Sequence, residues 1–515
     1  MLILQKLYII IVLAILSLSI NGIANSSIAI NDNEDFDPLA DVSVTVEIKA
    51  IRFLEAEKTG SNALIMFFRD TGENNRFSSF LDIIKRIFNN KIQGEINSDD
   101  TPNFFVKVFI NDVEFISDIW SNTKYLYNLD WTATLDVPDN LEFVEIKIQL
   151  WDSTAGAFKG SLIYDISGDT GDSEDQYDVE ITYSIKTGKW TGDDTYYDPS
   201  GYGRLCGCDD GTIYKKDRDS ELWFDIYQND YDGDGIPYWT EVNNYGTNPE
   251  IKNSGDPDND KIPVEWEYKW GYNPFVYEDY ENDPDGDSIN NFEEYLTSEW
   301  YSDPFRKDVF VELDLMGEGP NGEISYFPEN SEELITTAFD RQNIVYHQDY
   351  GDMGGHEIIP FEENVSRRDL YDIYYNYFLH GDENNWRRGV FHYGVVVYTS
   401  ESAAGYQYRA NAFQISSRGH ENIAKNHVSW DRDIVYGSAY MHELGHTFAF
   451  WPIPGHSHTA DDPWEIGFWI NRPYESCMNY GWMYQFVDYS DGSNGGVDIN
   501  DWGRIDYDAF ERNWG

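Results

Sequence analysis

Asp230-Tyr-Asp-Gly-Asp-Gly235 opens a motif that occurs three times and divides the 515-residue chain into three parts. Aspartates occupy alternate positions, and a glutamate, Glu241, stands at the twelfth position of the unit. The units start at residues 230, 256 and 283, and each one ends in a similar turn, at 246–249, 271–274 and 302–304. This period of 26 to 27 residues indicates an internal repeat.

The spacing within each unit suits a calcium loop. Alternate residues of a tight loop point inward, and the glutamate at the start of the following helix adds a bidentate ligand. Solvated acidic turns, the alternative, would not place a glutamate at the same offset each time. The candidate calcium ligands are Asp230, Asp232, Asp234, Glu241, Asp256, Asp258, Asp260, Glu267, Asp283, Asp285, Asp287 and Glu294.

These units resemble thrombospondin type 3 repeats and the loop of EF-hand proteins. The resemblance implies a calcium-binding repeat segment over 191–304 that Ca²⁺ stiffens into a stalk. Lys261 replaces the expected glycine in the second unit, so we expect that site to be weaker. Three carboxylates at bonding distance repel one another without a cation, and binding and folding should therefore be coupled.

The part before the repeats, residues 40–190, is predicted to be all-β. Apolar residues alternate with polar ones in 41–49, 104–110 and 144–150, and turn residues separate these stretches. A β-sandwich fits this pattern best.

Three stretches of this part resemble the calcium- and lipid-binding β-sandwich of protein kinase C and synaptotagmin. They are Asn103–Val108, Asp130–Thr134 and Gln149–Asp152. The resemblance implies that this domain could contact a membrane surface. The loop after Trp151 offers a single aspartate, Asp152, although Asp99 and Asp100 match the other calcium loop. We therefore expect a structural or docking role for this domain.

The part after the repeats, residues 305–515, changes to alternating strands and helices. Strands are predicted at 308–314, 344–347 and 390–398, and helices at 331–341, at about 435–450 and at 500–510. This alternation implies an α/β sheet. The overall fold class is therefore multidomain: an all-β sandwich, a calcium-binding repeat segment and an α/β domain.

The helix predicted near 435–450 carries Met441-His-Glu-Leu-Gly-His446. Residues four apart share one helix face, so His442 and His446 can hold one zinc ion. Glu443 lies beside the open position and can act as general base on a water that zinc activates. The neighbours Tyr440 and Leu444 make the helix largely buried, where histidines and a glutamate are costly unless paired or metal-bound.

The motif resembles that of the zinc endopeptidases called metzincins, and Ser476-Cys-Met-Asn-Tyr480 resembles their Met-turn. By that resemblance 305–515 is a metzincin-like catalytic domain that acts on a protein or peptide substrate. It further implies that Met478 lies beneath the zinc and that Tyr480 steadies the tetrahedral intermediate.

The sequence departs from the metzincin pattern after His446. Ala449 and Pro452 stand where the family has a glycine and its third ligand. Two prolines would end the helix, and Gly455 permits a sharp turn that returns His456 to the metal. We favour His456 as third ligand. The alternatives are His458 and Glu465.

Composition and the N-terminus point outside the cell. Lys6 precedes an apolar run with small residues after it, which predicts a signal peptide over 1–24 and a secreted or cell-surface-associated protein. A net charge of −57 argues against a nucleic-acid partner, and part of it fits salt adaptation. Only three cysteines occur, which is no disulfide framework.

Two functions stay open at this point. The first is a secreted zinc endopeptidase, and the second is a calcium-stiffened adhesion or structural protein with a vestigial zinc site. Glu443 separates them, because a protein without activity has no reason to keep the base.

Overall fold

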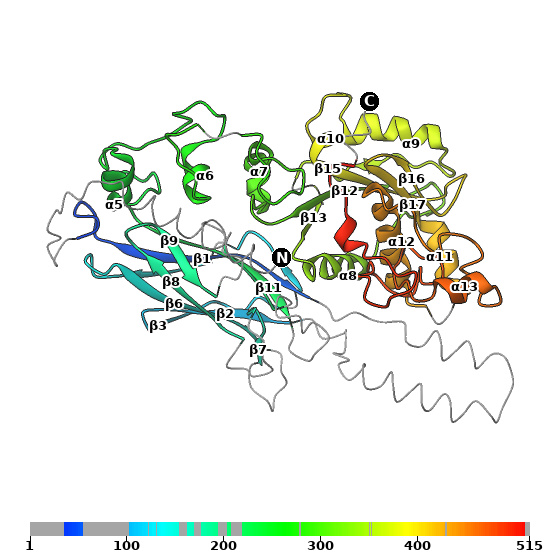
Figure 1. Ribbon diagram of the computed structural model, residues 1–515, viewed down its shortest axis with the longest axis horizontal. Helices are drawn as coiled ribbons and strands as arrows, with labels where there is room; N and C mark the ends of the chain where they lie inside the picture. The colour runs from blue at the N-terminus through cyan, green and yellow to red at the C-terminus, as the bar shows by residue number, and fades with distance from the viewer. Residues whose placement is uncertain are drawn as a thin grey trace, which may run out of the picture.

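The computed structural model shows three parts side by side, and Figure 1 places the β-strands of the first at one end and the helices of the last at the other. The structure describes residues 35–54, 102–121, 123–129, 131–153, 162–168, 177–193, 203–207, 219–277, 280–349, 351, 353–427 and 430–509. The predicted signal peptide, Asp99, Asp100, Asp130 and Cys208 lie outside these residues.

Two antiparallel sheets form the first part. The five-stranded sheet has the order β10-β11-β1-β4, with β5 also paired to β1, and the six-stranded sheet has the order β3-β2-β6-β8-β9, with β7 paired to β6. The first sheet consists of β1 (Ser43–Phe53), β4 (Tyr125–Leu126), β5 (Trp131–Asp136), β10 (Gly203–Cys206) and β11 (Ser220–Gln228). The second consists of β2 (Phe104–Ile110), β3 (Val113–Ile116), β6 (Phe143–Asp152), β7 (Leu162–Tyr164), β8 (Val179–Ser184) and β9 (Lys189–Gly192).

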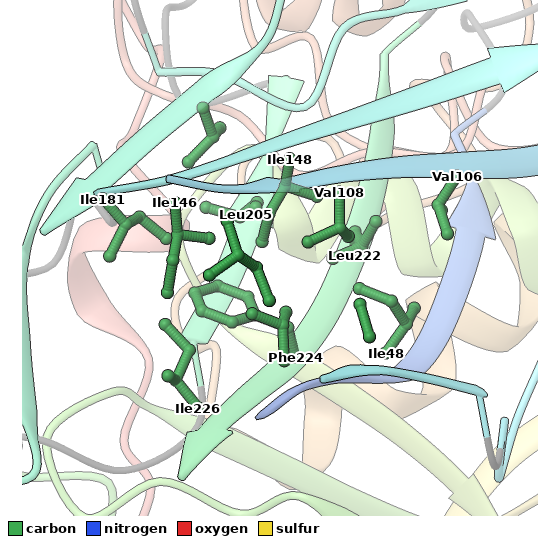
Figure 2. Packing of buried hydrophobic residues seen from close by; sticks show 14 of the residues in the cluster. Ile48, Val106, Val108, Ile146, Ile148, Ile181, Leu205, Leu222, Phe224 and Ile226 are labelled. Atoms are coloured by element: carbon green, nitrogen blue, oxygen red, sulfur yellow. The ribbon is translucent and has the colours of Figure 1, made fainter. Parts of the chain in front are cut away.

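Side chains from both sheets meet in one apolar core. Ile48 and Phe224 from one sheet and Val106 and Ile148 from the other are fully buried there (Figure 2). The period-two alternation of each strand puts these side chains on the inner face. The all-β prediction for this part is confirmed.

The sandwich continues past residue 190, where the sequence suggested that it ends. β11 pairs with β1 from Val44↔Gln228 to Phe53↔Ser220, and β10 adds to its other side. β11 belongs to the sandwich because its Leu222 and Phe224 face the apolar core. The sequence did not predict this continuation because the stretch before β11 shows no strand periodicity.

The repeats form short helices that each follow an acidic loop. These helices are α5 (Tyr238–Thr240) with a π-helical turn (Glu241–Tyr245), α6 (Val264–Lys269), and α7 (Asn291–Thr297) with a 3₁₀ turn (Ser298–Trp300). They do not stand free as a stalk. Tyr268 donates its hydroxyl to the carbonyl of Thr187, and Thr240 donates to that of Lys186. The first two repeats are thus packed along the sandwich.

The last part is a six-stranded mixed sheet in the order β13-β12-β15-β17-β16, with β14 also paired to β12. All pairings are parallel except that of β16 with β17. The strands are β12 (Asp308–Met316), β13 (Val345–Asp349), β14 (Ile358–Ile359), β15 (Phe391–Val397), β16 (Gly405–Arg409) and β17 (Ala412–Ser416). The helices are α8 (Glu329–Asp340), α9 (Arg367–Ile373) with a π-helical turn (Tyr374–Phe378), α10 (Arg387–Val390), α11 (Ser417–Asn426), α12 (Arg432–Thr447) and α13 (Ile466–Asn471).

Each face of this sheet has its own core. Val309 and Val311 of β12 pack with α8 and α12, whereas Phe310 packs with α9 on the opposite face. Helices on both faces explain why β12 and β15 are buried along nearly their whole length, although β12 contains the acidic residues Asp308, Glu312 and Asp314. Within the described residues no helix combines the length and the apolar character needed to cross a membrane.

Two predicted helices differ from the observed ones. The helix predicted near 435–450 spans Arg432–Thr447 and ends where Ala449 adopts φ of 58°. The predicted closing helix is reduced to a 3₁₀ turn, Trp502–Arg504. Asp501 is held at the start of that turn because its buried carboxylate accepts hydrogen bonds from Tyr474 and Ser476.

Candidate metal centres

α12 holds the predicted zinc motif in the interior of the last part. It starts at Asp431, whose side chain caps the helix by accepting from the Asp433 amide, and it packs against α8, β16 and β17. His442 and Glu443 are 2% and 4% exposed. Burying these polar side chains costs free energy unless they are hydrogen-bonded or bind a metal ion.

Three imidazoles meet at one point. The ring centroids of His442, His446 and His456 are 4.9, 5.1 and 5.0 Å apart. One ligand atom from each lies within 4.8 Å of the others, and the Nε2 atoms of His442 and His456 are 3.2 Å apart. Tetrahedral zinc with Zn–N bonds of about 2.0–2.1 Å would separate two ligand nitrogens by about 3.3 Å.

The turn after α12 carries His456 back to the helix. Gly455 has φ of 73°, and a Cβ there would lie 2.2 Å from Oδ1 of Asn479. Its carbonyl accepts from the amide of Tyr480 at 3.2 Å. The two alternatives for the third ligand lie elsewhere: His458 is 94% exposed beside Asp461, and Glu465 is exposed at the start of α13.

The protonation state of the three histidines suits a metal ion. Nδ1 of His442 donates to the carbonyl of Cys477 at 2.9 Å, which leaves the lone pair on Nε2 free to face the other two rings. Burial lowers the pKa of His446 to about 3 and lowers the pKa values of His442 and His456 as well. Three neutral imidazoles with converging lone pairs fit zinc.

Glu443 lies next to this triad against the edge strand β16. A Cβ on Gly405 would lie 2.6 Å from its Oε1, so the glycine makes room for the carboxyl group. Burial raises the pKa of Glu443 to about 8, and a hydrogen bond from the backbone of Gln407 opposes this rise. The positive charge of a zinc ion held by the triad would lower this pKa and favour the carboxylate, the form that accepts a proton.

The Met-turn-like segment lies on the other side of the triad. Met478 is fully buried, and a Cβ on Gly445 would lie 2.5 Å from its sulfur, which places Met478 against the turn of α12 that bears the histidines. The ring of Tyr480 lies 4.4 Å from that of His456 and 5.5 Å from that of His442. Burial raises the pKa of Tyr480, so its hydroxyl stays a donor.

The three acidic loops share one internal geometry. In the first, Oδ1 of Asp230 accepts from the amides of Gly233 and Asp234, and its Oδ2 accepts from that of Gly235. The same bonds recur around Asp256 and Asp283. Each loop brings carboxylate oxygens of its three aspartates within 4.8 Å of one another.

The same carboxylate oxygen of each loop is buried without a hydrogen-bond partner. It is Oδ2 of Asp232, Asp258 and Asp285, the same position in each repeat. Burial raises the pKa of Asp232 to about 6 and that of Glu241 to about 7, and neighbouring aspartates add to both shifts. An orphaned oxygen in a cluster of mutually repelling carboxylates is the donor set that Ca²⁺ requires.

The structure adds residues that the sequence did not indicate. The carbonyl of Cys477 orients His442, Gln407 donates its side-chain amide to the carbonyl of His446, and Asp308 joins the third acidic loop. No sequence motif indicates these three residues, because each reaches its site through a tertiary contact. Cys477 is a free thiol, and burial raises its pKa well above its usual range.

Comparison with known proteins gives little more. No family model matches the chain, and no curated protein matches it. Among solved structures, human GIVD cytosolic phospholipase A2 matches at 8% identity and a TM-score of 0.18. The match covers 36% of this chain and only 17% of the phospholipase. An isolated C2 domain and a C2 domain from a plant extended synaptotagmin match at 7% identity, cover 36% of this chain and 97% and 94% of theirs, and have TM-scores of 0.17 and 0.18. Similarity at this level identifies no activity.

Proposed function

We propose that the chain is an exported, calcium-containing zinc endopeptidase. The observation that carries the proposal is the triangle of His442, His446 and His456 with the buried carboxyl group of Glu443 beside it. The apolar N-terminal run of the sequence supports export, and the three acidic loops support calcium. When bound, zinc polarises a substrate carbonyl and lowers the pKa of a water molecule to about 7.

Two side chains perform the proton chemistry. Glu443 takes a proton from the attacking water and passes it to the leaving amine, since it stands directly beside His442 on α12 and near Tyr480. The hydroxyl of Tyr480 donates to the oxygen that becomes negative as the carbonyl turns tetrahedral. His442 is held in one orientation by the carbonyl of Cys477, and this fixes the geometry at which both groups act.

The sheet offers a place for a polypeptide substrate. β16 lies at the end of the strand order, so its outer edge has no neighbouring strand in the sheet as described. An extended peptide can pair with such an edge through its main chain. Gly405 of β16 contacts Glu443, and a peptide on this edge would therefore run past the catalytic group. This favours proteins or peptides as substrates.

The test combines zinc analysis with cleavage of a labelled, unfolded protein. Glu443→Gln should keep one zinc and lower kcat by about 10²- to 10⁴-fold, because it removes only the base. His456→Ala should lose zinc with its fold intact, whereas His458→Ala and Glu465→Gln, the matched controls, should keep both metal and activity. Stoichiometric zinc in His456→Ala would assign the third ligand elsewhere.

The same assay tests the second candidate function, that of an adhesion or structural protein. A wild-type chain that holds zinc and calcium but cleaves no unfolded protein, and that behaves like Glu443→Gln, would support that function and contradict the endopeptidase.

A further inference from the structure

The first and third acidic loops differ in the residue that closes them. In the first repeat this residue is Asn253, whose backbone amide donates to Oδ2 of Asp234 at 3.0 Å. Its side-chain amide donates to Asp234 at 2.9 Å and to Glu241 at 3.1 Å. A neutral side chain thus satisfies two carboxylates of the first loop.

In the third repeat the equivalent position belongs to Asp308, the first residue of β12. Its backbone amide donates to Oδ2 of Asp287 at 2.6 Å, just as Asn253 does to Asp234. Its side chain, however, is a third carboxyl group where the first repeat has an amide. Oxygens of Asp287, Glu294 and Asp308 lie within 4.8 Å of one another, and the residues are 3%, 0% and 2% exposed.

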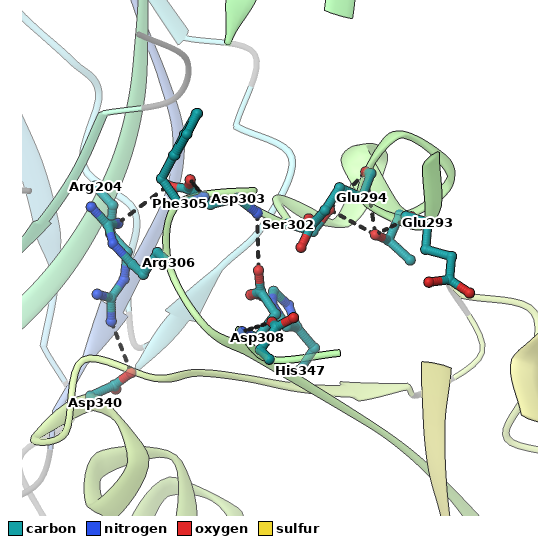
Figure 3. A network of polar contacts seen from close by, with 12 residues as sticks. Arg204, Glu293, Glu294, Ser302, Asp303, Phe305, Arg306, Asp308, Asp340 and His347 are labelled. Carbon is teal, nitrogen blue, oxygen red and sulfur yellow. Dashed lines mark hydrogen bonds and ion pairs between the residues drawn. The ribbon is translucent and has the colours of Figure 1, made fainter. Parts of the chain in front are cut away.

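Glu294 provides an independent sign of a missing ligand. Neither of its carboxylate oxygens has a hydrogen-bond partner at normal geometry, although both are buried. The nearby hydroxyl of Ser302 has one proton, which it donates to the backbone carbonyl of Glu294 at 2.9 Å (Figure 3). A fully buried carboxylate in this position is costly unless a cation or a proton balances it.

Charge on the surrounding residues does not balance the cluster. The third loop collects five carboxyl groups: Asp283, Asp285, Asp287, Glu294 and Asp308. Lys307 directs its ammonium group to the carbonyls of Asp285 and Gly286, at 2.7 and 2.8 Å. His347 bonds to Oδ1 of Asp308 and can offset one charge at most, and Arg306, which also acts on Asp308, is shared with Asp303 at 4.0 Å.

We propose that the third loop holds Ca²⁺ in a site shared between the repeats and the catalytic sheet, with Asp308 of β12 as the additional ligand. The proposal rests on the calcium part of the proposed function and not on peptidase activity. An added carboxylate raises the charge of the site, so this site should bind Ca²⁺ most tightly of the three.

The position of Asp308 ties calcium to the folding of the last part. Asp308 starts β12, which pairs with β13, β14 and β15, and bonds to His347 of β13. Lys307 lies over the ring of Tyr507, so the C-terminal segment rests on the same loop. Calcium in the third loop therefore stabilises one end of the catalytic sheet, whereas calcium in the first loop stabilises the first repeat and its packing on the sandwich.

A reciprocal exchange tests the proposal on the full-length, zinc-loaded chain after calcium is removed with a calcium-selective chelator. Calorimetric titration with Ca²⁺ should show that Asp308→Asn weakens the tightest site by about tenfold or more, since ligand charge sets affinity. Asn253→Asp, its counterpart in the first repeat, should strengthen a weaker site. Unchanged calcium constants in both variants would overturn the proposal.

A second measurement needs no variant. Hydrogen exchange of the wild-type chain, followed during the same titration, should show protection of 308–316 and 345–349 rising as the tightest site fills. Protection that rises only with the weaker sites would contradict the shared site. A wild-type chain that binds no Ca²⁺ would refute both the calcium part of the proposed function and this inference. A chain that binds Ca²⁺ but cleaves no protein would contradict only the peptidase part of the proposed function.

Discussion

At the scale of single residues, Tyr480 gives the sharpest prediction for chemistry. Its hydroxyl remains protonated at neutral pH because burial raises its pKa, and its ring lies against His456. Tyr480→Phe should lower kcat by about 10²- to 10³-fold and leave zinc content and KM unchanged, because it removes a donor to the developing oxyanion. Steady-state cleavage assays with Tyr277→Phe, an exposed tyrosine, as control measure this. A kcat equal to that of the wild type would exclude the role.

A second residue, His420, predicts how stability depends on pH. It is fully buried, its Nδ1 donates to the carbonyl of Ser416 at 2.9 Å, and burial lowers its pKa to about 4. Below about pH 6.5 the imidazole of His420 is protonated in the unfolded chain but stays neutral in the folded chain. The free energy of unfolding therefore falls as the pH drops from about 6.5 to about 4, at about 1.4 kcal/mol per pH unit.

His420→Gln should remove this slope. Between pH 7 and pH 5 the wild type should lose about 2 kcal/mol more than the variant, as measured by urea unfolding of the calcium- and zinc-loaded proteins. Metal release and carboxylates affect both chains equally, so the difference isolates the histidine. Parallel pH profiles would show that His420 accepts its proton in the folded state.

At the scale of elements, the turn between α12 and His456 decides whether the proposed zinc site closes. Gly455 faces Asn479, whose side-chain amide donates to the carbonyls of Asn471 and Tyr474. Gly455→Ala would push this asparagine away and move His456 and the Met-turn-like segment with it. The dissociation constant for zinc should rise by about tenfold or more.

Gly496→Ala is the matched control for that turn. Gly496 also has a positive φ, 68°, but a Cβ there meets open space. Both substitutions should lower the free energy of unfolding by about 1 kcal/mol through backbone strain. Only Gly455→Ala should release zinc in a competition with a chromogenic chelator. Equal zinc affinities would show that the turn is not rigid.

The same turn shows what the sequence could predict. His442 and His446 could be predicted as candidate zinc ligands from the sequence because a helix places residues four apart on one face. The third ligand stayed open among His456, His458 and Glu465 because its approach depends on the conformation of Ala449 and on the contact with Asn479. Local pattern indicated the helices and strands, whereas tertiary contacts decided where they end.

The acidic loops and the C-terminus make the same point. The repeat was visible because all its ligands lie within twelve consecutive positions. The sequence did not predict Asp308 as a member of the third loop because it reaches the loop from the next domain. The closing helix was expected from capping residues, but Asp501 bonds to Tyr474 and Ser476 and holds the chain in a short turn.

At the scale of the whole molecule, a buried charge network joins the sandwich to the last part, the proposed catalytic domain. Arg52 of β1 and Arg204 of β10 each bond to Glu221 of β11 and to Asp340 of α8. Figure 3 shows Arg204 reaching Asp340 across the boundary. All four side chains are at most 4% exposed. Two guanidinium groups and two carboxylates neutralise each other there.

Asp340→Ala would break this balance. The variant leaves two buried arginines facing one glutamate, and the loss of one partner from a buried ion network costs about 3–5 kcal/mol. Because the network spans two domains, the cost falls on their contact and not on either core. The sandwich and the last part should then unfold in separate transitions, whereas the wild type should unfold in one coupled transition.

Differential scanning calorimetry with the zinc- and calcium-loaded chain measures this separation. Glu329→Ala, an exposed position on the first turn of the same helix, is the control and should leave the transitions as they are. A glutamate in place of the aspartate keeps the charge, so Asp340→Glu should restore part of the coupling although its longer side chain fits less well. If Asp340→Ala unfolded with the wild-type profile, the two arginines would be satisfied by Glu221 alone. The sandwich and the last part would then be joined by apolar contacts such as that of Trp223 with Val345.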